Sequence, residues 1–421
     1  MAEQKGKILV IGGGISGVST ALEAAEVGYD VILVEKNPSL GGRVSRFYQY
    51  FPKLCPPLCG LEINYKRLKP NPYIQTLTNS EVESISGEPG KYQVKITTNP
   101  TFVNEKCVIC DKCTEVCPSE RESEHNYGLD KTKAIFIPHK MAYPARFTID
   151  RDACDPSCSK CVEACEYDAI DLQMQPKTTD IEVAAIVYAT GWKPYDANKI
   201  DNLGFGKVEN VINNVMMERI AHGQGPTQGQ LLRPSDQKKA DSIAFVQCAG
   251  SRDENHLPYC SAVCCLASLK QARYARLANP DAKIYIFYID IRSPGKYEDF
   301  ATEIQKDENI IMVKGKVAKV TQGQGGNVRG FAFLFKAKSP RCVKRETEKE
   351  GTKNGYSDAV VGWVPGGGKQ RANKEKERER NADYSQGSPK ANDKPQAMAR
   401  LVDTQHEGCP LDAIFDQFFK R

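Results

Sequence analysis

The sequence lacks the features that would place it in several large classes of protein. No apolar run in its 421 residues approaches the roughly 18 residues that cross a bilayer, and the N-terminus reads as a strand rather than a signal peptide. The net charge of +5 is too small to indicate nucleic-acid binding. These absences predict a cytoplasmic protein without a membrane span of its own. Any contact with the inner membrane is expected to come through partner subunits.

The chain is instead rich in cysteine. It holds 16 cysteines, and 40% of its residues are hydrophobic and 26% charged, which is typical of a soluble globular protein. A length of 421 residues allows two or three domains. Without a signal peptide, so many cysteines indicate a reducing compartment and metal ligation rather than a disulfide scaffold.

Eight of the cysteines stand in two runs with ferredoxin spacing. The runs read C-x2-C-x2-C-x3-C-P and C-x3-C-x2-C-x3-C, and they comprise Cys107, Cys110, Cys113 and Cys117, then Cys154, Cys158, Cys161 and Cys165. In a two-cluster bacterial ferredoxin, three cysteines of a run bind one iron–sulfur cluster and the fourth binds the other. The pattern therefore predicts two [4Fe–4S] clusters, one bound by Cys107, Cys110, Cys113 and Cys165 and one by Cys117, Cys154, Cys158 and Cys161.

Two details of the second run depart from the ferredoxin pattern. Three residues instead of two follow Cys154, and Glu166 stands where a proline is usual. A structural zinc ribbon is the alternative interpretation, but zinc motifs usually place two C-x2-C pairs well apart. We therefore expect this segment to carry electrons.

The N-terminal stretch has the order of elements that a dinucleotide site requires. Residues 7–11 form a short apolar run that predicts a buried parallel strand, residues 12–17 match G-x-G-x-x-G, and residues 18–27 are typical of a helix. A second strand is expected at residues 30–34 and ends at Glu35. A carboxylate at this distance from the glycines is placed to bind a ribose hydroxyl.

Each glycine of the motif has its own expected role. Gly12 allows the tight turn, Gly14 lets the backbone approach a pyrophosphate, and Gly17 allows the helix to pack closely on the strand. Ile15 and Ser16 begin the helix, whose N-terminus faces the phosphates. These five residues are therefore predicted to contact the cofactor.

Two further elements favour FAD over NAD. Residues 35–43 read E-K-x-x-x-x-G-G-R, which resembles an extension used for FAD by flavoproteins with two dinucleotide-binding domains. A predicted strand at residues 184–188 leads into Ala-Thr-Gly, which resembles the element that returns the chain to the cofactor in the same family. Beyond the glycine turn, the residues predicted to bind FAD are Glu35, Lys36, Gly42, Arg43, Thr190 and Gly191.

The resemblance implies an α/β fold of the thioredoxin-reductase type, with a two-cluster ferredoxin of α+β type inserted in its FAD domain. The insertion would place the clusters beside the flavin, which exchanges two electrons at one end and single electrons at the other. The expected domains are the FAD domain at 1–100 and 179–240, the ferredoxin insert at 101–178, a second nucleotide-binding-like domain at 241–340 and an irregular, partly mobile segment at 341–421.

A third group of cysteines stands where a nicotinamide site would be expected. A strand is predicted at residues 243–247, but a cysteine and an arginine occupy the turn after it, in place of a second glycine fingerprint. A helix running to about Leu277 follows. The four thiols at this junction predict a third [4Fe–4S] cluster, with buried structural cysteines as the alternative. They are Cys248, Cys260, Cys264 and Cys265.

Four other cysteines have no assigned role. The motif Cys55-Pro-Pro-Leu-Cys59 is compatible with an extra pair of cluster ligands, a redox dithiol or two packed thiols, and its double proline excludes a helix across it. Cys342 and Cys409 lie in the weakly patterned C-terminal part.

The motifs together resemble the A subunit of heterodisulfide reductase. The shared residues are Q-C-A-G-S-R-D at 247–253, Y-C-S-A-V-C-C at 259–265, the interrupted flavin fingerprint and Tyr-Ile-Asp-Ile-Arg at 288–292. Members of that family are usually longer, and a short form is similar to the A subunit of the quinone-interacting membrane-bound oxidoreductase of sulfate reducers. The resemblance implies electron transfer between menaquinone and adenylylsulfate reductase. It also implies two partners, namely a haem-bearing membrane subunit plus a second flavin/iron–sulfur subunit.

The predicted function is therefore electron transfer by an oxidoreductase subunit whose cofactors carry the chemistry, with no catalytic side chain. The alternative is a self-contained FAD-dependent disulfide or pyridine-nucleotide oxidoreductase that uses Cys55 and Cys59 as its redox dithiol. The missing second glycine fingerprint disfavours it. A purely structural cysteine-rich scaffold would leave the flavin fingerprint unexplained.

Overall fold

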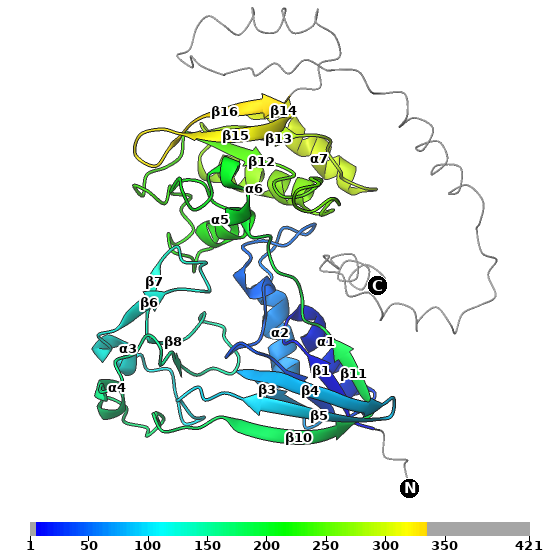
Figure 1. The fold of residues 1–421 in the computed structure, drawn as a ribbon, viewed down its shortest axis with the longest axis vertical. Helices are drawn as coiled ribbons and strands as arrows, with labels where there is room; N and C mark the ends of the chain where they lie inside the picture. The colour runs from blue at the N-terminus through cyan, green and yellow to red at the C-terminus, as the bar shows by residue number, and fades with distance from the viewer. Residues whose placement is uncertain (1–5, 335–421) are drawn as a thin grey trace, which may run out of the picture.

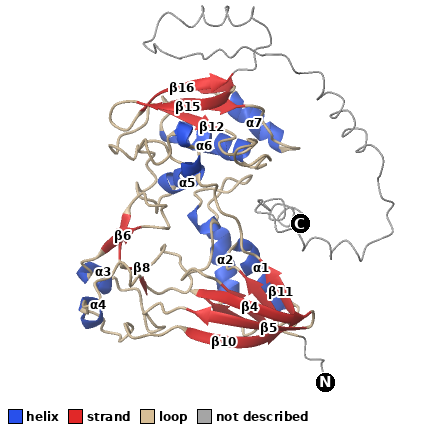
Figure 2. Cartoon of the chain, viewed as in Figure 1, coloured by secondary structure: helices blue, strands red, loops and turns tan. Residues whose placement is uncertain are grey.

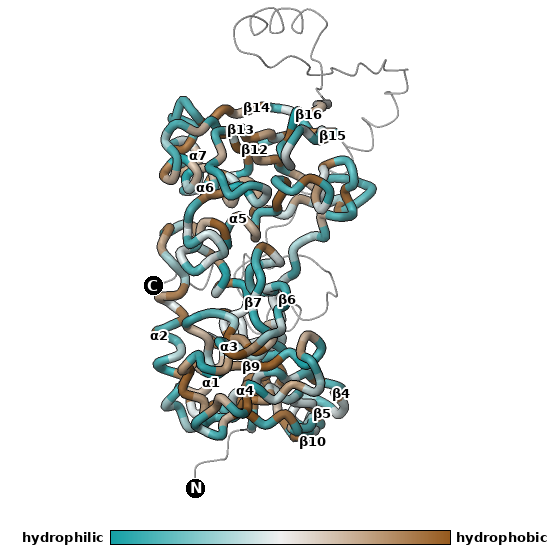
Figure 3. The backbone as a smooth tube through the Cα atoms, turned by 90° about the vertical axis from the view of Figure 1, so that its left-hand side faces the viewer, coloured by the Kyte–Doolittle hydropathy of each residue, from teal (hydrophilic) through white to brown (hydrophobic). Residues whose placement is uncertain are grey.

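The computed structural model describes residues 6–334. The expected segment at 341–421, with Cys342 and Cys409, lies outside the described residues. Figure 1 shows the described chain as two lobes joined near helix α5 (Asn214–Ala221). The view from the side shows the same order along the molecule (Figure 3). Helix α5 lies between α6 (Cys264–Ala278) and the hairpin of β6 (Glu120–Glu122) and β7 (Lys131–Lys133).

The first lobe is built on a four-stranded parallel sheet with the order β11-β1-β2-β3. All four residues of β2 are buried, as expected for a short apolar run between two neighbours. Helix α1 packs on the sheet through residues spaced three and four apart, among them Val18, Leu22 and Ala25. The elements are β1 (Ile8–Ile11), α1 (Ile15–Glu26), β2 (Val31–Val34), the short helix η1 (Val44–Arg46), α2 (Leu58–Leu68), β3 (Ile74–Leu77) and β11 (Ala185–Tyr188).

A three-stranded antiparallel sheet with the order β10-β5-β4 packs against this layer. Its strands are β4 (Ser80–Glu88), β5 (Lys91–Thr98) and β10 (Lys177–Val183). Because β5 and β10 are hydrogen-bonded neighbours, the chain leaves this sheet after Thr98 and returns to it at Lys177. The predicted ferredoxin segment is this excursion.

The excursion has little regular structure, and Figure 2 shows it mostly as loop. Its core consists largely of cysteines and the apolar residues around them, including the buried Cys113, Cys117 and Cys161. Ile170, near the end of the excursion, forms a single antiparallel bridge to Val103. The elements are α3 (Lys112–Val116), β6 (Glu120–Glu122), β7 (Lys131–Lys133), β8 (Ile135–Phe136), β9 (Thr148–Ile149) and α4 (Lys160–Glu163).

The second lobe repeats the parallel arrangement on a smaller scale. Its sheet has the order β12-β13-β14, and its helices bury apolar residues against the sheet. The two parallel sheets with their helices confirm the predicted α/β fold class, while the ferredoxin-like nature of the insert remains a prediction. The elements are β12 (Ser242–Val246), α6 (Cys264–Ala278), β13 (Lys283–Tyr288), α7 (Tyr297–Gln305) and β14 (Ile310–Lys314), followed by the antiparallel pair β15 (Lys316–Gln322) and β16 (Val328–Leu334).

Buried polar contacts hold the two lobes together. Lys270 of α6 pairs with Glu218 of α5 at 3.0 Å, and both side chains are almost fully buried. The same ammonium donates to the carbonyl of Gln49 at 2.7 Å. The ring of Phe51 lies 4.9 Å from the ring of Tyr297 on α7. The loop after η1 therefore joins the first lobe to α5, α6 and α7.

Candidate flavin site and cysteine clusters

The glycine turn after β1 has the geometry of a phosphate site. A Cβ on Gly12, whose φ is +110°, would lie 2.3 Å from the carbonyl oxygen of Ala189, and a Cβ on Gly17 would lie 1.8 Å from the carbonyl oxygen of Gly12. Gly14 differs because its Cβ would meet no atom within 4 Å. Packing therefore requires the two outer glycines, while the open space beside Gly14, at the N-terminus of α1, suits a pyrophosphate. Ile15 and Ser16 form the first turn of this helix.

Glu35 lies at the end of β2 and is buried. Its carboxylate accepts hydrogen bonds from the Gly13 N–H at 2.7 Å and from the backbone and side chain of Asn37 at 2.8 and 2.6 Å. The acid is thus held beside the glycine turn, although Lys36, the next predicted cofactor residue, is exposed. Binding of a ribose hydroxyl by Glu35 remains a prediction.

Arg43 joins the two FAD elements that the sequence places far apart. Its Nε donates to the carbonyl of Trp192, directly after the Ala-Thr-Gly segment, and its guanidinium lies 5.0 Å from the centre of the Trp192 ring. Gly42 lies so close to Gly14 that a Cβ on it would be 3.0 Å from the Gly14 Cα. Gly191, next to Thr190, has a φ of +70° and open space where a Cβ would stand. The structure thus brings most of the predicted FAD residues to one edge of the sheet, and their open backbone fits the cofactor.

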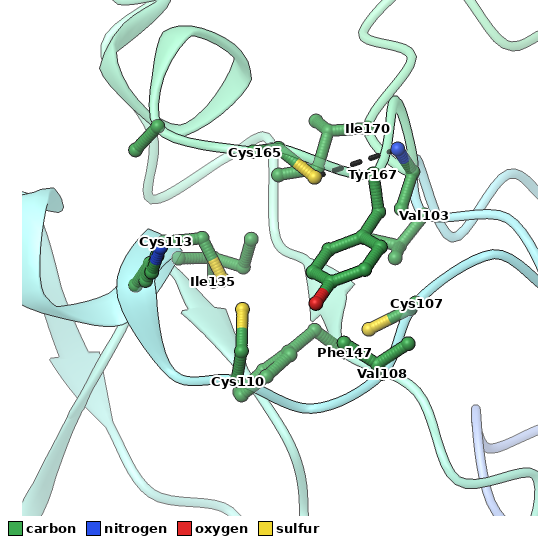
Figure 4. Close-up of a pocket in the computed structure, with 13 residues that line it drawn as sticks. Val103, Cys107, Val108, Cys110, Cys113, Ile135, Phe147, Cys165, Tyr167 and Ile170 are labelled. Atoms are coloured by element: carbon green, nitrogen blue, oxygen red, sulfur yellow. Dashed lines mark hydrogen bonds between the residues drawn. The ribbon is translucent and has the colours of Figure 1, made fainter.

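The eight ferredoxin-type cysteines line two cavities. Figure 4 shows the first cavity, with Cys107, Cys110 and Cys113 around one side and Cys165 on the other. The second cavity is lined by Cys117 with Cys154, Cys158 and Cys161. Each cavity combines three thiols of one run with the last thiol of the other. Binding of clusters by these thiols remains a prediction.

Local backbone geometry explains how the thiols converge. Ile109 and Asp111 have φ values of +56° and +62°, which curl the first loop around its cavity, and α3 then carries Cys113 inward. The N–H of Ala169 points at the Cys165 sulfur at 3.4 Å, and an Arg151 N–H approaches the Cys154 sulfur at 3.5 Å. Such donors suit sulfur that carries negative charge.

The chemistry of the buried thiols also fits a cationic cluster. Burial, with the charges of neighbouring thiols, raises the pKa of Cys113 to about 12, and burial raises the pKa of Cys161. A bound cation would compensate the negative charge that these thiols carry as thiolate ligands. Among residues 6–334, no group of three or more His, Cys, Asp or Glu side chains is spaced to hold a single metal ion.

The third cysteine group meets at the end of β12 and the start of α6. Cys248 follows the strand with a φ of +56°, and Cys264 and Cys265 are the first residues of the helix. Hydrogen bonds from the neighbouring thiols lower the pKa of Cys264, and the same contacts raise those of Cys248 and Cys265. Cys260 lies close enough to Cys248 for its charge to contribute to the raised pKa of Cys248. The structure therefore brings together the four thiols, and their binding of a third cluster remains a prediction.

The turn that holds this group leaves no open backbone for a pyrophosphate. Gly250 has a φ of +76°, and a Cβ on it would lie 2.8 Å from the Tyr195 ring. The next loop is fixed by contacts from Arg252 to the Asp290 carboxylate and from Lys316 to the Asp253 carboxylate. This turn therefore differs from the glycine turn of the first lobe, where Gly14 is open.

Sequence reasoning missed several residues around the flavin site. Tyr127 of the insert accepts a hydrogen bond from Arg43 at 3.4 Å, and the carbonyl of Tyr143 accepts one from the Leu40 N–H at 2.8 Å. No motif marks these insert residues.

In the structure, the Cys55–Cys59 motif lies beside Tyr50. Helix α2 begins just after the two prolines, so Cys59 lies in its first turn while Cys55 precedes it. A side-chain hydrogen bond with Cys55, together with burial, raises the pKa of Tyr50 to about 12. The structure assigns no ligand role to this pair.

Comparison with known proteins finds relatives that are similar over most of this chain. Residues 7–49 match the FAD dependent oxidoreductase family. The chain is 40% identical over 323 residues to the A subunit of the ferredoxin/F(420)H(2)-dependent CoB-CoM heterodisulfide reductase of Methanosarcina acetivorans, covering 76% of this chain and 40% of that protein. It is 38% identical to the A subunit of the H(2):CoB-CoM heterodisulfide,ferredoxin reductase of Methanothermobacter marburgensis, covering 75% of this chain and 48% of that protein.

Among solved structures, a T. acidophilum thioredoxin reductase aligns over 80% of this chain and 72% of that chain, at 12% identity and a TM-score of 0.37. None of the helices within residues 6–334 is long and apolar enough to cross a membrane. The chain spans less than half the length of the two heterodisulfide reductase relatives. Over about three quarters of its own length, this chain is therefore similar in sequence to A subunits of heterodisulfide reductase.

Proposed function

We propose that this chain is an FAD and iron–sulfur electron-transfer subunit of a multisubunit oxidoreductase. The observation that carries the proposal is the crossed arrangement of eight cysteines around two cavities, in the same chain as an open glycine turn. Crossed ligation is the arrangement of two-cluster ferredoxins. A zinc ribbon gives no reason for the last cysteine of each run to join the other run.

The chain's own residues have positioning roles in this proposal. The glycine turn, Glu35 and Arg43 would hold FAD, which supplies the exchange between two-electron and one-electron transfer when it is bound. Cys248, Cys260, Cys264 and Cys265 would hold a third cluster at the end of β12. We also propose the domain limits given above, with residues 101–178 as an inserted ferredoxin-like domain.

The finer proposal concerns the pathway and the partners. We propose transfer between the membrane menaquinone pool and adenylylsulfate reductase, in a complex with a haem-containing membrane subunit plus a second flavin/iron–sulfur subunit. The resemblance of the cysteine motifs supports it, and the chain would then be peripheral to the inner membrane through its partners. The test is purification of the tagged chain from membranes of its own cells. Haem and a second flavoprotein are expected to co-purify, and recovery of the chain alone with full quinone activity would contradict the proposal.

The first experiment for the proposed function is a count of cofactors. Anaerobically purified protein is expected to contain about twelve irons with matching acid-labile sulfide, four for each of three clusters, and one FAD. A count of about eight irons with one FAD would exclude the third cluster and remain consistent with the two ferredoxin-type clusters. Zinc in place of iron, or protein without flavin, would overturn the proposal itself. Rapid reduction of the FAD by NADH or NADPH would favour the self-contained oxidoreductase instead.

A further inference from the structure

A group of cationic and histidine side chains, all buried except the half-buried Arg46, lies where three parts of the chain meet. We call it the junction cluster and define it as Arg46 of η1, His125 and His139 of the insert, and Arg219 and His222 at the end of α5. Arg219 is only 1% exposed, and the three histidines are 6 to 9% exposed. Neither the cysteine motifs nor the glycine turn accounts for this group.

The arginines of the cluster have no carboxylate partner. Arg219 donates through Nε to the Asn126 side-chain oxygen at 2.8 Å, through Nη2 to the Gln224 carbonyl at 2.8 Å and through Nη1 to the Arg46 carbonyl at 3.3 Å. Within the described part of the chain, neither Arg46 nor Arg219 forms an ion pair with an acidic side chain. The neighbouring Glu218 pairs with Lys270 instead. A buried guanidinium without a counter-ion is costly, so the site suits an anionic group.

The two insert histidines also have buried ring nitrogens without hydrogen-bond partners. Their ring centroids are 5.0 Å apart, and His125 Nε2 and both ring nitrogens of His139 are buried without a hydrogen-bond partner. Burial, followed by the charge of Arg219, lowers the pKa of His139 to about 4 and that of His125 well below its ordinary value. Neutral imidazoles keep one N–H donor each. Unpaired donors at this depth indicate a bound group that completes them.

The junction cluster adjoins the candidate flavin site. Arg43 follows the Gly-Gly pair directly, and Arg46 lies three residues further on. Both contact Tyr127, Arg43 through a hydrogen bond at 3.4 Å and Arg46 through a cation–π distance of 5.1 Å. The Arg46 guanidinium also donates to the carbonyl of Glu124, next to His125, at 3.0 Å. The same segment that carries FAD recognition residues therefore leads into the cluster within three residues.

We propose that the junction cluster holds the isoalloxazine ring of FAD and compensates the negative charge that this ring gains on reduction. The inference rests on the proposed function. Oxidised flavin that takes up two electrons and one proton carries one negative charge on its ring. Arg46 and Arg219 supply the compensating charge, and His125 and His139 supply N–H donors. Charge and hydrogen bonds at the ring are the means by which a protein tunes a flavin.

The discriminating variant is His139→Leu in the complete, cofactor-loaded protein. Because neither ring nitrogen of His139 has a partner, the change removes no hydrogen bond from the protein itself. We expect the affinity for reduced FAD to fall about tenfold relative to that for oxidised FAD, which lowers the two-electron midpoint potential of the flavin by about 30 mV. The potential is read by anaerobic titration with dithionite, following the flavin band. If the variant loses FAD during purification, FAD is titrated back in each redox state to obtain the same ratio.

The matched control is His256→Leu, because His256 lies in the second lobe and bonds to Tyr195. The proposal is supported if the midpoint potential of the flavin shifts in His139→Leu and stays unchanged in His256→Leu. Equal midpoints for the wild type and both variants would overturn it while leaving FAD binding, and so the proposed function, intact. Arg219→Lys is the second variant. Because this variant retains the positive charge, its flavin potential should lie closer to that of the wild type than the potential of Arg219→Met does. Equal flavin potentials for Arg219→Lys and Arg219→Met would also contradict the proposal. Wild-type protein without FAD would instead refute the proposed function.

Discussion

The two lobes contain the same strand–turn–helix unit, but the turn between strand and helix differs. In the first lobe, β1 passes through three residues, 12–14, before α1 begins at Ile15. In the second lobe, β12 ends at Val246 and α6 begins only at Cys264, so the intervening loop can supply Cys248 and Cys260. Both turns lie at the carboxyl end of a parallel strand, where such folds bind their ligands.

The difference shows how residues at one topological position decide the chemistry. The glycines of the first turn let the helix approach and leave backbone open at Gly14, which suits phosphate. In the second turn, the Tyr195 ring covers Gly250 and the thiols occupy the helix start. The fold is shared, while the site is set by side chains placed on it.

The largest effect is expected at the glycine turn of the first lobe. Gly17→Ala should lower the free energy of unfolding by about 1–3 kcal/mol and abolish FAD binding, because its Cβ would lie 1.8 Å from a backbone oxygen. Gly14→Ala should leave the stability of the flavin-free protein unchanged and weaken FAD binding about tenfold or more. Thermal unfolding and fluorescence titration with FAD measure the two effects. Equal destabilisation by both substitutions would show that Gly14 has no special relation to the cofactor.

An intermediate effect is expected at the thiol turn of the second lobe. Cys248→Ala should reduce the iron content from about twelve to about eight atoms per chain and leave one FAD bound. The matched control is Cys59→Ala, an exposed thiol outside the three cysteine sets, which should change neither count. Metal analysis and flavin absorbance measure both. Full iron content in the Cys248→Ala protein would return the third group to structural packing.

Sequence reasoning succeeded where burial and spacing are local. The runs at 7–11, 30–34 and 184–188 became β1, β2 and β11 within one residue at each end, because short apolar runs between turns specify buried parallel strands. The grouping of the third set of thiols was also visible, since all four cysteines lie within 18 residues, from 248 to 265.

Other features required contacts that the sequence does not encode locally. The strand β5 shows alternation at Tyr92, Val94 and Ile96, which was an available signal, but β10 is polar and is defined by its pairing with β5. The junction cluster joins His139 to Arg219 across 80 residues of chain (219 − 139), without a motif. Long-range packing of isolated polar residues leaves no periodic trace.

The smallest effect is expected from the charge beside the thiol turn. Asp290 follows β13, its carboxylate contacts Arg252, and its carbonyl accepts a hydrogen bond from the Cys265 thiol at 3.8 Å. Asp290→Asn removes one negative charge near the third cysteine set, so that cluster should become easier to reduce and its midpoint potential should rise. Because the ion pair is partly exposed, the free energy of unfolding should change by less than about 1 kcal/mol. Asp253→Asn, whose carboxylate pairs with Lys316 instead, is the control. Redox titration followed by electron paramagnetic resonance separates this cluster from the flavin, and a rise in the flavin potential rather than the cluster potential would contradict the independence of the two turns.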